Sequence, residues 1–421
     1  MTTMETTHSD VPLLPDSDAG LLAATPPEIP QTLTVADHLL TVFVESGPLF
    51  ESLLADIRNA KRRIWIEVYI FYNDAGPTRI AEALKEKARE GVDVRVLYDA
   101  LGSVSTPATF FSSLSAAGVK VHAYHSFWEV VRRVNPFTML NRRNHRKLIV
   151  IDEAIGYFGG MNLIDNVETV REQKAEYRPT SSGWRDVHLR IEGPQQSDLA
   201  ESYIRSWARA HGEKICKRPR AYRRATFHHK GAFPSAAAQE ESIHFFDSGP
   251  GNRYSHAGRI FSSLIRHARD SITISMAYFL PVGSVARALL RARRHGVRIR
   301  IIVPGKSDVK LVQRAANYLY NKLLKRGFRI YERQHRMLHS KAMVVDGLHS
   351  VVGSCNLDPR SLYTNLEFLA VIRSHAFADV IQKICRYEIS ESERITLAET
   401  EKTPRFQRFI NYLAWSLRWW L

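Results

Sequence analysis

One order of secondary-structure elements occurs twice in this chain of 421 residues, and this duplication constrains the fold more than any other feature. A helical stretch precedes each copy and ends near Arg63 in the first copy and near Arg269 in the second. The strand, helix and strand that follow are predicted at 64–71, 79–90 and 92–98 in the first copy and at 272–279, 284–295 and 297–303 in the second. Strands that alternate with helices in this way are typical of βαβ units. The sequence therefore predicts an α/β fold class with two similar lobes.

Differences in composition along the chain indicate where the predicted lobes begin and end. Residues 1–35 are rich in Thr, Ser, Asp, Pro and Ala without useful periodicity, and we interpret them as a flexible leader. The two lobes are predicted at 36–210 and 242–400, joined by a polar, basic linker at 211–241. An amphipathic helix is predicted at 401–421.

The net charge limits the partners. There are 59 Lys and Arg against 43 Asp and Glu, which gives a formal charge of +16. Such a surface attracts polyanions, either nucleic acid or the anionic headgroups of a membrane, and charge alone does not choose between them. We find no secretory signal and no run of 18 apolar residues in the sequence, so any membrane contact is expected to be peripheral. Three widely spaced cysteines argue against a disulfide framework and against a zinc site.

The most specific pattern lies late in each copy and reads H-x-K-x4-D-x6-G-[GS]-x-N. Its residues are His145, Lys147, Asp152 and Asn162 in the first copy and His339, Lys341, Asp346 and Asn356 in the second. A single H-x-K occurs by chance in many proteins. Two complete copies at identical spacing, each in the same place within its repeat, indicate a shared chemical role.

The spacing predicts how these side chains point. Residues alternate between the two faces of a strand, so the His and Lys of each copy share one face, whereas Asp152 and Asp346 have the opposite parity and are expected to be mainly structural. The small residues allow a turn that brings Asn162 and Asn356 back toward the same point. If the lobes face each other, the imidazoles, ammoniums and carboxamides form a phosphate cradle with a nucleophile and a proton donor. No metal and no cofactor are expected.

This double pattern resembles the signature of the phospholipase D superfamily over about residues 40–400. The resemblance implies two α/β/α lobes with the active site at their interface and a two-step phosphoryl transfer that uses the motif residues as the catalytic set. It also implies that His145 is the nucleophile and that His339 protonates the leaving alcohol and later deprotonates the acceptor. Asp186 and Glu367 match the carboxylates that orient the two histidines. The sequence itself leaves open which histidine has which role.

Softer matches at 184–194, 326–332 and 356–361 resemble bacterial cardiolipin synthases of a short form without N-terminal transmembrane helices. That resemblance implies transfer of a phosphatidyl group from phosphatidylglycerol to a second lipid hydroxyl, at the bacterial cell membrane. Two alternatives remain: a phosphodiesterase of the same superfamily that hydrolyses phospholipid or nucleic acid, and a non-catalytic basic scaffold. Two intact motifs argue against the scaffold.

The C-terminal helix supports an anionic phospholipid membrane, and not nucleic acid, as the partner. Its predicted apolar face consists of Phe406, Phe409, Ile410, Leu413, Leu417, Trp420 and Leu421. Arginines flank this face, as in helices that lie in the lipid interface, and the alternative is a helix docked on its own protein. A basic aromatic segment at 127–143 is a second candidate surface. Glu67 and Tyr69, on a strand predicted to be buried, receive no catalytic role.

Overall fold

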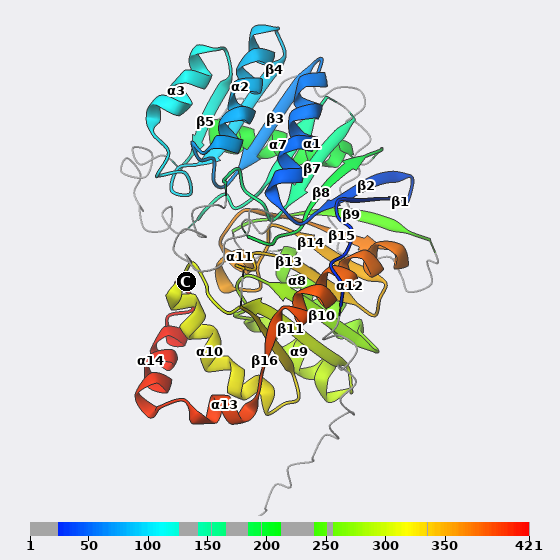
Figure 1. Cartoon of the computed structure of the whole chain (residues 1–421), viewed down its shortest axis with the longest axis vertical. Helices are drawn as coiled ribbons and strands as arrows, with labels where there is room; N and C mark the ends of the chain where they lie inside the picture. The colour runs from blue at the N-terminus through cyan, green and yellow to red at the C-terminus, as the bar shows by residue number, and fades with distance from the viewer. Residues whose placement is uncertain are drawn as a thin grey trace, which may run out of the picture.

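Two lobes, one above the other in Figure 1, make up the protein, and each is built on an eight-stranded mixed sheet. The computed structural model describes the residue ranges 24–125, 142–152, 154–165, 184–194, 196–211, 240–250, 256–334 and 336–420. The first lobe contains the strands β1 (Gln31–Val35), β2 (His38–Phe43), β3 (Arg63–Val68), β4 (Asp93–Asp99), β5 (Lys120–Tyr124), β6 (Leu148–Ile151), β7 (Ile155–Gly159) and β8 (His188–Glu192). Its helices are α1 (Ser46–Asn59), α2 (Ala75–Arg89), α3 (Ala108–Ala116) and α7 (Gln196–His211).

The second lobe repeats this plan. Its strands are β9 (Ser242–Ser248), β10 (Ser271–Met276), β11 (Arg298–Pro304), β12 (Arg329–Arg333), β13 (Lys341–Val345), β14 (His349–Gly353), β15 (Glu367–Arg373) and β16 (Ser392–Ile395). Its helices are α8 (His256–His267), α9 (Gly283–Arg294), α10 (Lys310–Leu324), α11 (Pro359–Tyr363), α12 (His375–Ser390), α13 (Leu397–Lys402) and α14 (Arg405–Ser416).

The order of the strands confirms the duplication. The first sheet runs β1-β2-β8-β7-β6-β3-β4-β5, and the second, read from its far edge, runs β9-β15-β14-β13-β10-β11-β12-β16. Seven strands therefore correspond one to one, and β1 and β16 are additions at opposite edges. In both sheets the strand pairs β3–β4–β5 and β10–β11–β12 are parallel, as βαβ units require, and the remaining pairs are antiparallel.

The predicted strands at 64–71 and 272–279 exist but leave their sheets earlier than expected, at Val68 and Met276. Beyond these points the chain pairs with the segments that follow the hairpins β6–β7 and β13–β14. The bridges are Phe71–Leu163 in the first lobe and Phe279–Leu357 in the second. The leader predicted at 1–35 also needs correction, because residues 31–35 form β1 and pair with β2. Residues 1–23, most of the linker predicted at 211–241 and most of the surface segment predicted at 127–143 lie outside the described residues.

Helices cover both faces of each sheet, which gives the predicted α/β/α lobes. On the outer faces, α1, α2 and α3 pack on the first sheet and α8, α9 and α10 on the second, each group around its own apolar cluster. A third cluster lies between the lobes, where the inner faces of both sheets meet α7 and α12. In the described part of the chain, none of the helices is long and apolar enough to cross a bilayer.

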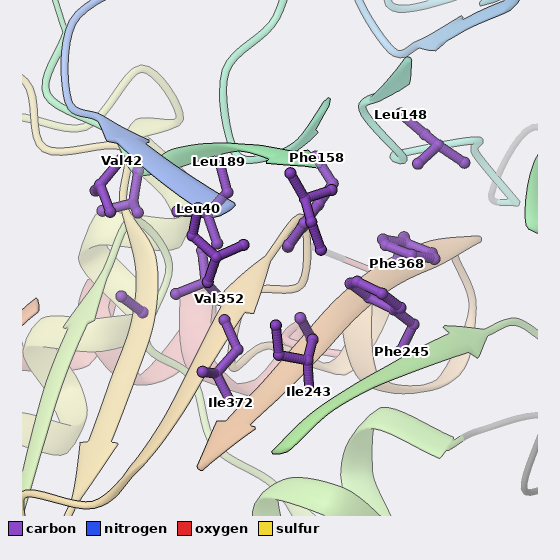
Figure 2. Packing of buried hydrophobic residues seen from close by; sticks show 14 of the residues in the cluster. Leu40, Val42, Leu148, Phe158, Leu189, Ile243, Phe245, Val352, Phe368 and Ile372 are labelled. Atoms are coloured by element: carbon purple, nitrogen blue, oxygen red, sulfur yellow. The ribbon is translucent and has the colours of Figure 1, made fainter. Parts of the chain in front are cut away.

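The shared cluster joins the lobes through close aromatic contacts (Figure 2). Phe158 of β7 lies edge-to-face against Phe245 of β9 and Phe368 of β15, with ring centroids 5.3 and 5.8 Å apart. Phe245 and Phe368 stack on each other at 5.6 Å. These rings are almost fully buried, so the two lobes share one core and are expected to unfold together.

We therefore expect Phe158→Ala to lower the free energy of unfolding by about 3–5 kcal/mol, because it removes a buried ring at the junction of the lobes. Urea denaturation followed by tryptophan fluorescence measures this loss. Phe406→Ala is the matched control, because Phe406 is 74% exposed, and its effect should stay within about 0.5 kcal/mol. A loss confined to one of two separate transitions would contradict the shared core.

Candidate active site

Each catalytic histidine predicted from the sequence is held in place by the opposite lobe. Residue Asn144, just before His145, forms a bridge with Leu366 of the second lobe, and the backbone N–H of His145 donates to the Leu366 carbonyl at 3.0 Å. The same contact occurs in reverse, because Arg185 bridges Leu338 and the N–H of His339 donates to the Arg185 carbonyl at 2.7 Å. Two parallel bridges between the lobes thus bring both histidines to the junction.

The orienting carboxylates are exchanged between the lobes in the same way. Nδ1 of His145 lies 3.1 Å from both carboxylate oxygens of Glu367 in the second lobe. Nδ1 of His339 lies 2.6 Å from Oδ2 of Asp186 in the first lobe. Each carboxylate therefore completes the histidine of the other motif. An imidazole whose Nδ1–H donates to a carboxylate presents the lone pair of Nε2 on its far side.

Both motif lysines lie beside their histidines, as residues that share a strand face should. Nζ of Lys147 donates to the His145 carbonyl at 2.6 Å. Nζ of Lys341 lies 2.7 Å from Nδ1 of His339 and 3.5 Å from Asp186. Both ammonium groups are almost fully buried, so they supply positive charge where little solvent screens it.

Asp152 and Asp346 do not join this cluster. Each lies in a turn with positive φ, 50° and 53°, just after the buried strands β6 and β13. The carboxylate of Asp152 accepts three backbone N–H groups at the start of β3, and that of Asp346 accepts the three equivalent groups before β10. The last residue of the H-x-K-x4-D pattern therefore fixes one strand to the next, far from the histidines.

The two asparagines follow β7 and β14 at equivalent points. Asn162 lines a small cavity together with Lys147 and accepts the N–H of Ile70 through Oδ1 at 3.2 Å. Asn356 is buried, and its Oδ1 has no hydrogen-bond partner within the part of the chain that the structure describes. Their phosphate-binding role remains a prediction, since the free Oδ1 of Asn356 shows only that this oxygen is not committed to the protein.

The small residues before these asparagines make room for the exchanged carboxylates. A Cβ on Gly160 would lie only 2.0 Å from an oxygen of Asp186, so no side chain fits there. The equivalent residue in the second motif is Ser354, whose hydroxyl donates to Glu367. The second small residue of the motif is therefore Gly where it lies against Asp186 and Ser where it donates to Glu367.

Two aromatic residues at the site escaped the sequence analysis. Tyr69, which received no role, packs edge-on against His145 with ring centroids 5.1 Å apart, and Nζ of Lys147 lies 5.3 Å from the centre of its ring. Trp184 packs against His339 at 4.8 Å. The signal for Trp184 was its position two residues before Asp186. Tyr69 could have been found from its position directly after β3, the strand that pairs with β6, which follows His145.

Burial dominates the electrostatics of the site. It lowers the pKa of His145 well below its usual value, and the charges of Lys147 and Lys341 lower it further, so this imidazole is neutral near pH 7. Burial likewise lowers the pKa of Lys147 to about 7 and raises that of Glu367 to about 7. Burial alone would raise the pKa of Asp186, but Lys341 and His339 outweigh it and keep this carboxylate ionised.

The arrangement suits nucleophilic attack at phosphorus. It combines a neutral imidazole, a second imidazole beside an ionised carboxylate, and two ammonium groups that can stabilise charge on phosphate oxygens. Among the described residues, no group of three or more His, Cys, Asp and Glu side chains is placed to hold a metal ion.

Comparisons with known proteins indicate one family. The family described as "Cardiolipin synthase, PLD-like domain" matches residues 53–173 and 261–387, one segment in each lobe. The chain is 32% identical to a cardiolipin synthase of Listeria monocytogenes over 86% of its length and 70% of the relative. It is 29% identical to cardiolipin synthase A of Pseudomonas fluorescens over 91% of its length and 75% of the relative. A phosphatidylserine synthase of Haemophilus influenzae shares the fold, with a TM-score of 0.66 and 17% identity over 96% of this chain and 99% of that one.

The raised pKa of Glu367 predicts a pH-dependent stability. Below its unfolded pKa near 4.5 this carboxyl is protonated in both states, and its stabilising contribution is lost as pH rises toward about 7. We expect Glu367→Gln to remove this fall, so that the variant gains about 2–3 kcal/mol relative to the native chain between pH 4.5 and 7. Chemical denaturation across this range measures the difference. Parallel pH profiles for the two proteins would show that Glu367 titrates normally.

Proposed function

The chain belongs to the phospholipase D-like family of cardiolipin synthases, and from that premise we propose that it makes cardiolipin from phosphatidylglycerol. In this reaction one phosphatidylglycerol gives up its phosphatidyl group, glycerol leaves, and the headgroup hydroxyl of a second phosphatidylglycerol accepts the group. The observation that carries the proposal is the exchange of carboxylates, which prepares one histidine from each lobe for a different task.

In the first half-reaction His145 attacks. The lone pair of its Nε2 forms a bond to phosphorus while the bond from phosphorus to the glycerol oxygen breaks. His339 donates a proton to that oxygen, so glycerol leaves as a neutral alcohol. Glu367 holds Nδ1–H of His145 and stabilises the positive charge that the imidazole acquires.

In the second half-reaction the same groups act in reverse. His339, now neutral, takes the proton of the acceptor hydroxyl, whose oxygen attacks phosphorus as the bond from phosphorus to His145 breaks. The ammonium groups of Lys147 and Lys341 stabilise the charge on the non-bridging oxygens in both steps. The products are cardiolipin and the original enzyme.

Electrostatics support the assignment of His145 as the nucleophile. Burial lowers the pKa of His145 well below its usual value, and the charges of Lys147 and Lys341 lower it further, which favours the neutral imidazole that a nucleophile needs. Burial and Lys341 lower the pKa of His339 as well, but the ionised Asp186 opposes this shift and favours its protonated form. The histidine with the ionised partner therefore keeps its proton more readily near neutral pH, as the proton donor of the first half-reaction must.

The walls of the site favour transfer over hydrolysis. The side chain of His145 is 12% exposed and that of His339 is 6% exposed, and Tyr69 and Trp184 cover one side of each imidazole. Such a site limits access of water to the phosphohistidine, while a lipid held in the membrane has a high effective concentration.

We propose further that α14 binds this enzyme peripherally to the anionic surface of the bacterial cell membrane. The helix predicted at 401–421 is shorter, because α14 spans only Arg405–Ser416. It rests on α10 through Ala414 and Trp415, which leaves most of the predicted apolar face on the outside, with Ile410 half-buried and Leu421 outside the described residues. Its exposed apolar side chains include Phe406, Phe409 and Leu413, and Leu417, Trp419 and Trp420 extend this surface in the turn after the helix. Docking on its own protein and binding to lipid thus use opposite faces of the same helix.

The covalent transfer predicts a particular set of products. Purified protein mixed with phosphatidylglycerol vesicles should form cardiolipin and glycerol together, with phosphatidic acid as a minor product, as measured by lipid mass spectrometry. His145→Ala should lose all activity, because no phosphohistidine forms. His339→Ala should form at most a trace of it, because the leaving alcohol lacks its proton donor. Phosphatidic acid and glycerol in equal amounts, without cardiolipin, would identify a hydrolase.

His267→Ala is the control for these variants. His267 ends α8 on the surface, and its Nδ1 contacts only the Ser263 carbonyl of the same helix among the described residues. The product ratio of this variant should equal that of the native chain.

The exposed face of α14 predicts how the protein binds membranes. Replacing Phe406, Phe409 and Trp420 with Ser should weaken binding to phosphatidylglycerol vesicles by about tenfold or more, because three large apolar side chains no longer enter the lipid interface. Co-sedimentation with vesicles measures the affinity. Leu39→Ser, at a 40% exposed position on β2, controls for the loss of surface apolar area elsewhere. Equal binding of the triple variant and the native chain would show that α14 has only a packing role.

A further inference from the structure

We propose that Asp308 and Tyr278 form a subsite beside His339 that binds the hydroxyl groups of the alcohol entering or leaving the reaction. The proposal rests on the function proposed above and adds to it the recognition of a polyol headgroup. Neither residue belongs to the motifs, and neither is used in the two half-reactions.

The position of Tyr278 follows from the pairing of β10 with the start of β13. Lys341 is opposite Met276, and the N–H of Ala277 donates to the Ser340 carbonyl at 2.9 Å. One step further along both segments, Tyr278 is therefore placed next to His339. The hydroxyl of Tyr278 donates to the carboxylate of Asp308, with both oxygens at 2.7 Å.

Asp308 has no evident structural task. It lies between β11 and α10, but the N-cap residue of α10 is Val309, and no side chain caps that helix end. The carboxylate accepts only from Tyr278 and, at 3.3 Å, from the Ser307 hydroxyl, and it forms no salt bridge within the described ranges. A carboxylate has about four acceptor positions, so at least one remains for a ligand.

The charge of Asp308 reaches the acid–base pair. Burial lowers the pKa of His339 and of Lys341, and the ionised Asp186 and, in smaller measure, Asp308 oppose both shifts. A carboxylate in this position repels the phosphate of the substrate. Its presence is understandable if it accepts hydrogen bonds from neutral hydroxyl groups bound on the same side.

The first lobe lacks this feature. The bridges Phe71–Leu163 and Phe279–Leu357 make Ile70 the counterpart of Tyr278. The nearby carboxylate of Asp99 is fully buried, accepts the N–H groups of Asn144, Leu101 and Gly102 and lies 3.5 Å from the Arg143 guanidinium, so the protein itself encloses it. Among the described residues, an exposed carboxylate acceptor therefore occurs beside His339 and not beside His145, on the side where the alcohol gains or loses its proton.

Because the half-reactions mirror each other, one subsite serves two alcohols. In the first step it holds the glycerol that leaves, and in the second it holds the glycerol headgroup of the acceptor lipid. In each case one hydroxyl lies at His339 and the neighbouring hydroxyl reaches Asp308. A monohydric alcohol can make only the first of these contacts.

Competition between two added alcohols tests the subsite. The protein is incubated with phosphatidylglycerol vesicles and equal concentrations of deuterated glycerol and ethanol, and the two phosphatidyl products are quantified by mass spectrometry. Asp308→Ala should lower the glycerol-to-ethanol product ratio by about tenfold or more, because a site built to bind a hydroxyl discriminates strongly against its absence. Tyr278→Phe should lower the ratio less, and Asp379→Ala, which changes an exposed carboxylate on α12, should leave it unchanged.

The ratio separates this proposal from its premise. If the native chain makes cardiolipin but Asp308→Ala keeps the native ratio, the subsite is wrong and the synthase stands. If the native chain transfers no phosphatidyl group to any alcohol, the proposed synthase activity is wrong, and the subsite proposal that rests on it is wrong as well. A third arm adds ethanolamine. A preference for ethanolamine over glycerol that Asp308→Asn removes would identify an ammonium site and overturn the assignment to hydroxyls.

Discussion

The site depends on the exchange of backbone and carboxylate contacts across the junction of the lobes. In the second lobe, the Leu366 carbonyl accepts from the backbone of His145 and the neighbouring Glu367 contacts its imidazole. In the first lobe, Arg185 and Asp186 make the same two contacts with His339. Neither lobe therefore contains a complete histidine site of its own. The shared aromatic core around Phe158 keeps the junction rigid, and this rigidity is what maintains hydrogen bonds of fixed length between distant parts of the chain.

Burial of this junction sets the charges on which the chemistry relies. Removing Lys147 and His145 from water lowers both pKa values, which favours a neutral imidazole at the proposed nucleophile, and it raises the pKa of Glu367. Asp186 escapes this effect because Lys341 and His339 lie against it. Two motifs with the same residues thus acquire different proton affinities. Asp186 opposes the lowered pKa of His339, whereas Lys147, Lys341 and Arg360 all lower the pKa of His145.

Two other helices connect α14 to the candidate active site. α14 packs on α10, which begins just after Asp308, and Trp419 approaches Tyr363 at the end of α11 with ring centroids 6.0 Å apart. α11 also carries Arg360, whose charge reaches His145. Figure 1 accordingly shows the C-terminus close to the level at which the lobes meet. A lipid surface bound by α14, as proposed above, would therefore lie on the side of the second lobe that carries α10 and α11.

The sequence by itself determined the duplicated strand and helix order, the common face of each histidine and lysine, and the amphipathic period of α14, because these features depend on spacing within a few residues. Only the tertiary structure decided which carboxylate serves which histidine, since Glu367 is 222 positions from His145 and Asp186 is 153 from His339. It also decided that Tyr69 and Trp184 line the site and that Tyr278 meets Asp308. Such contacts join segments through the pairing of strands and the packing of two lobes, and no local pattern in the chain records them.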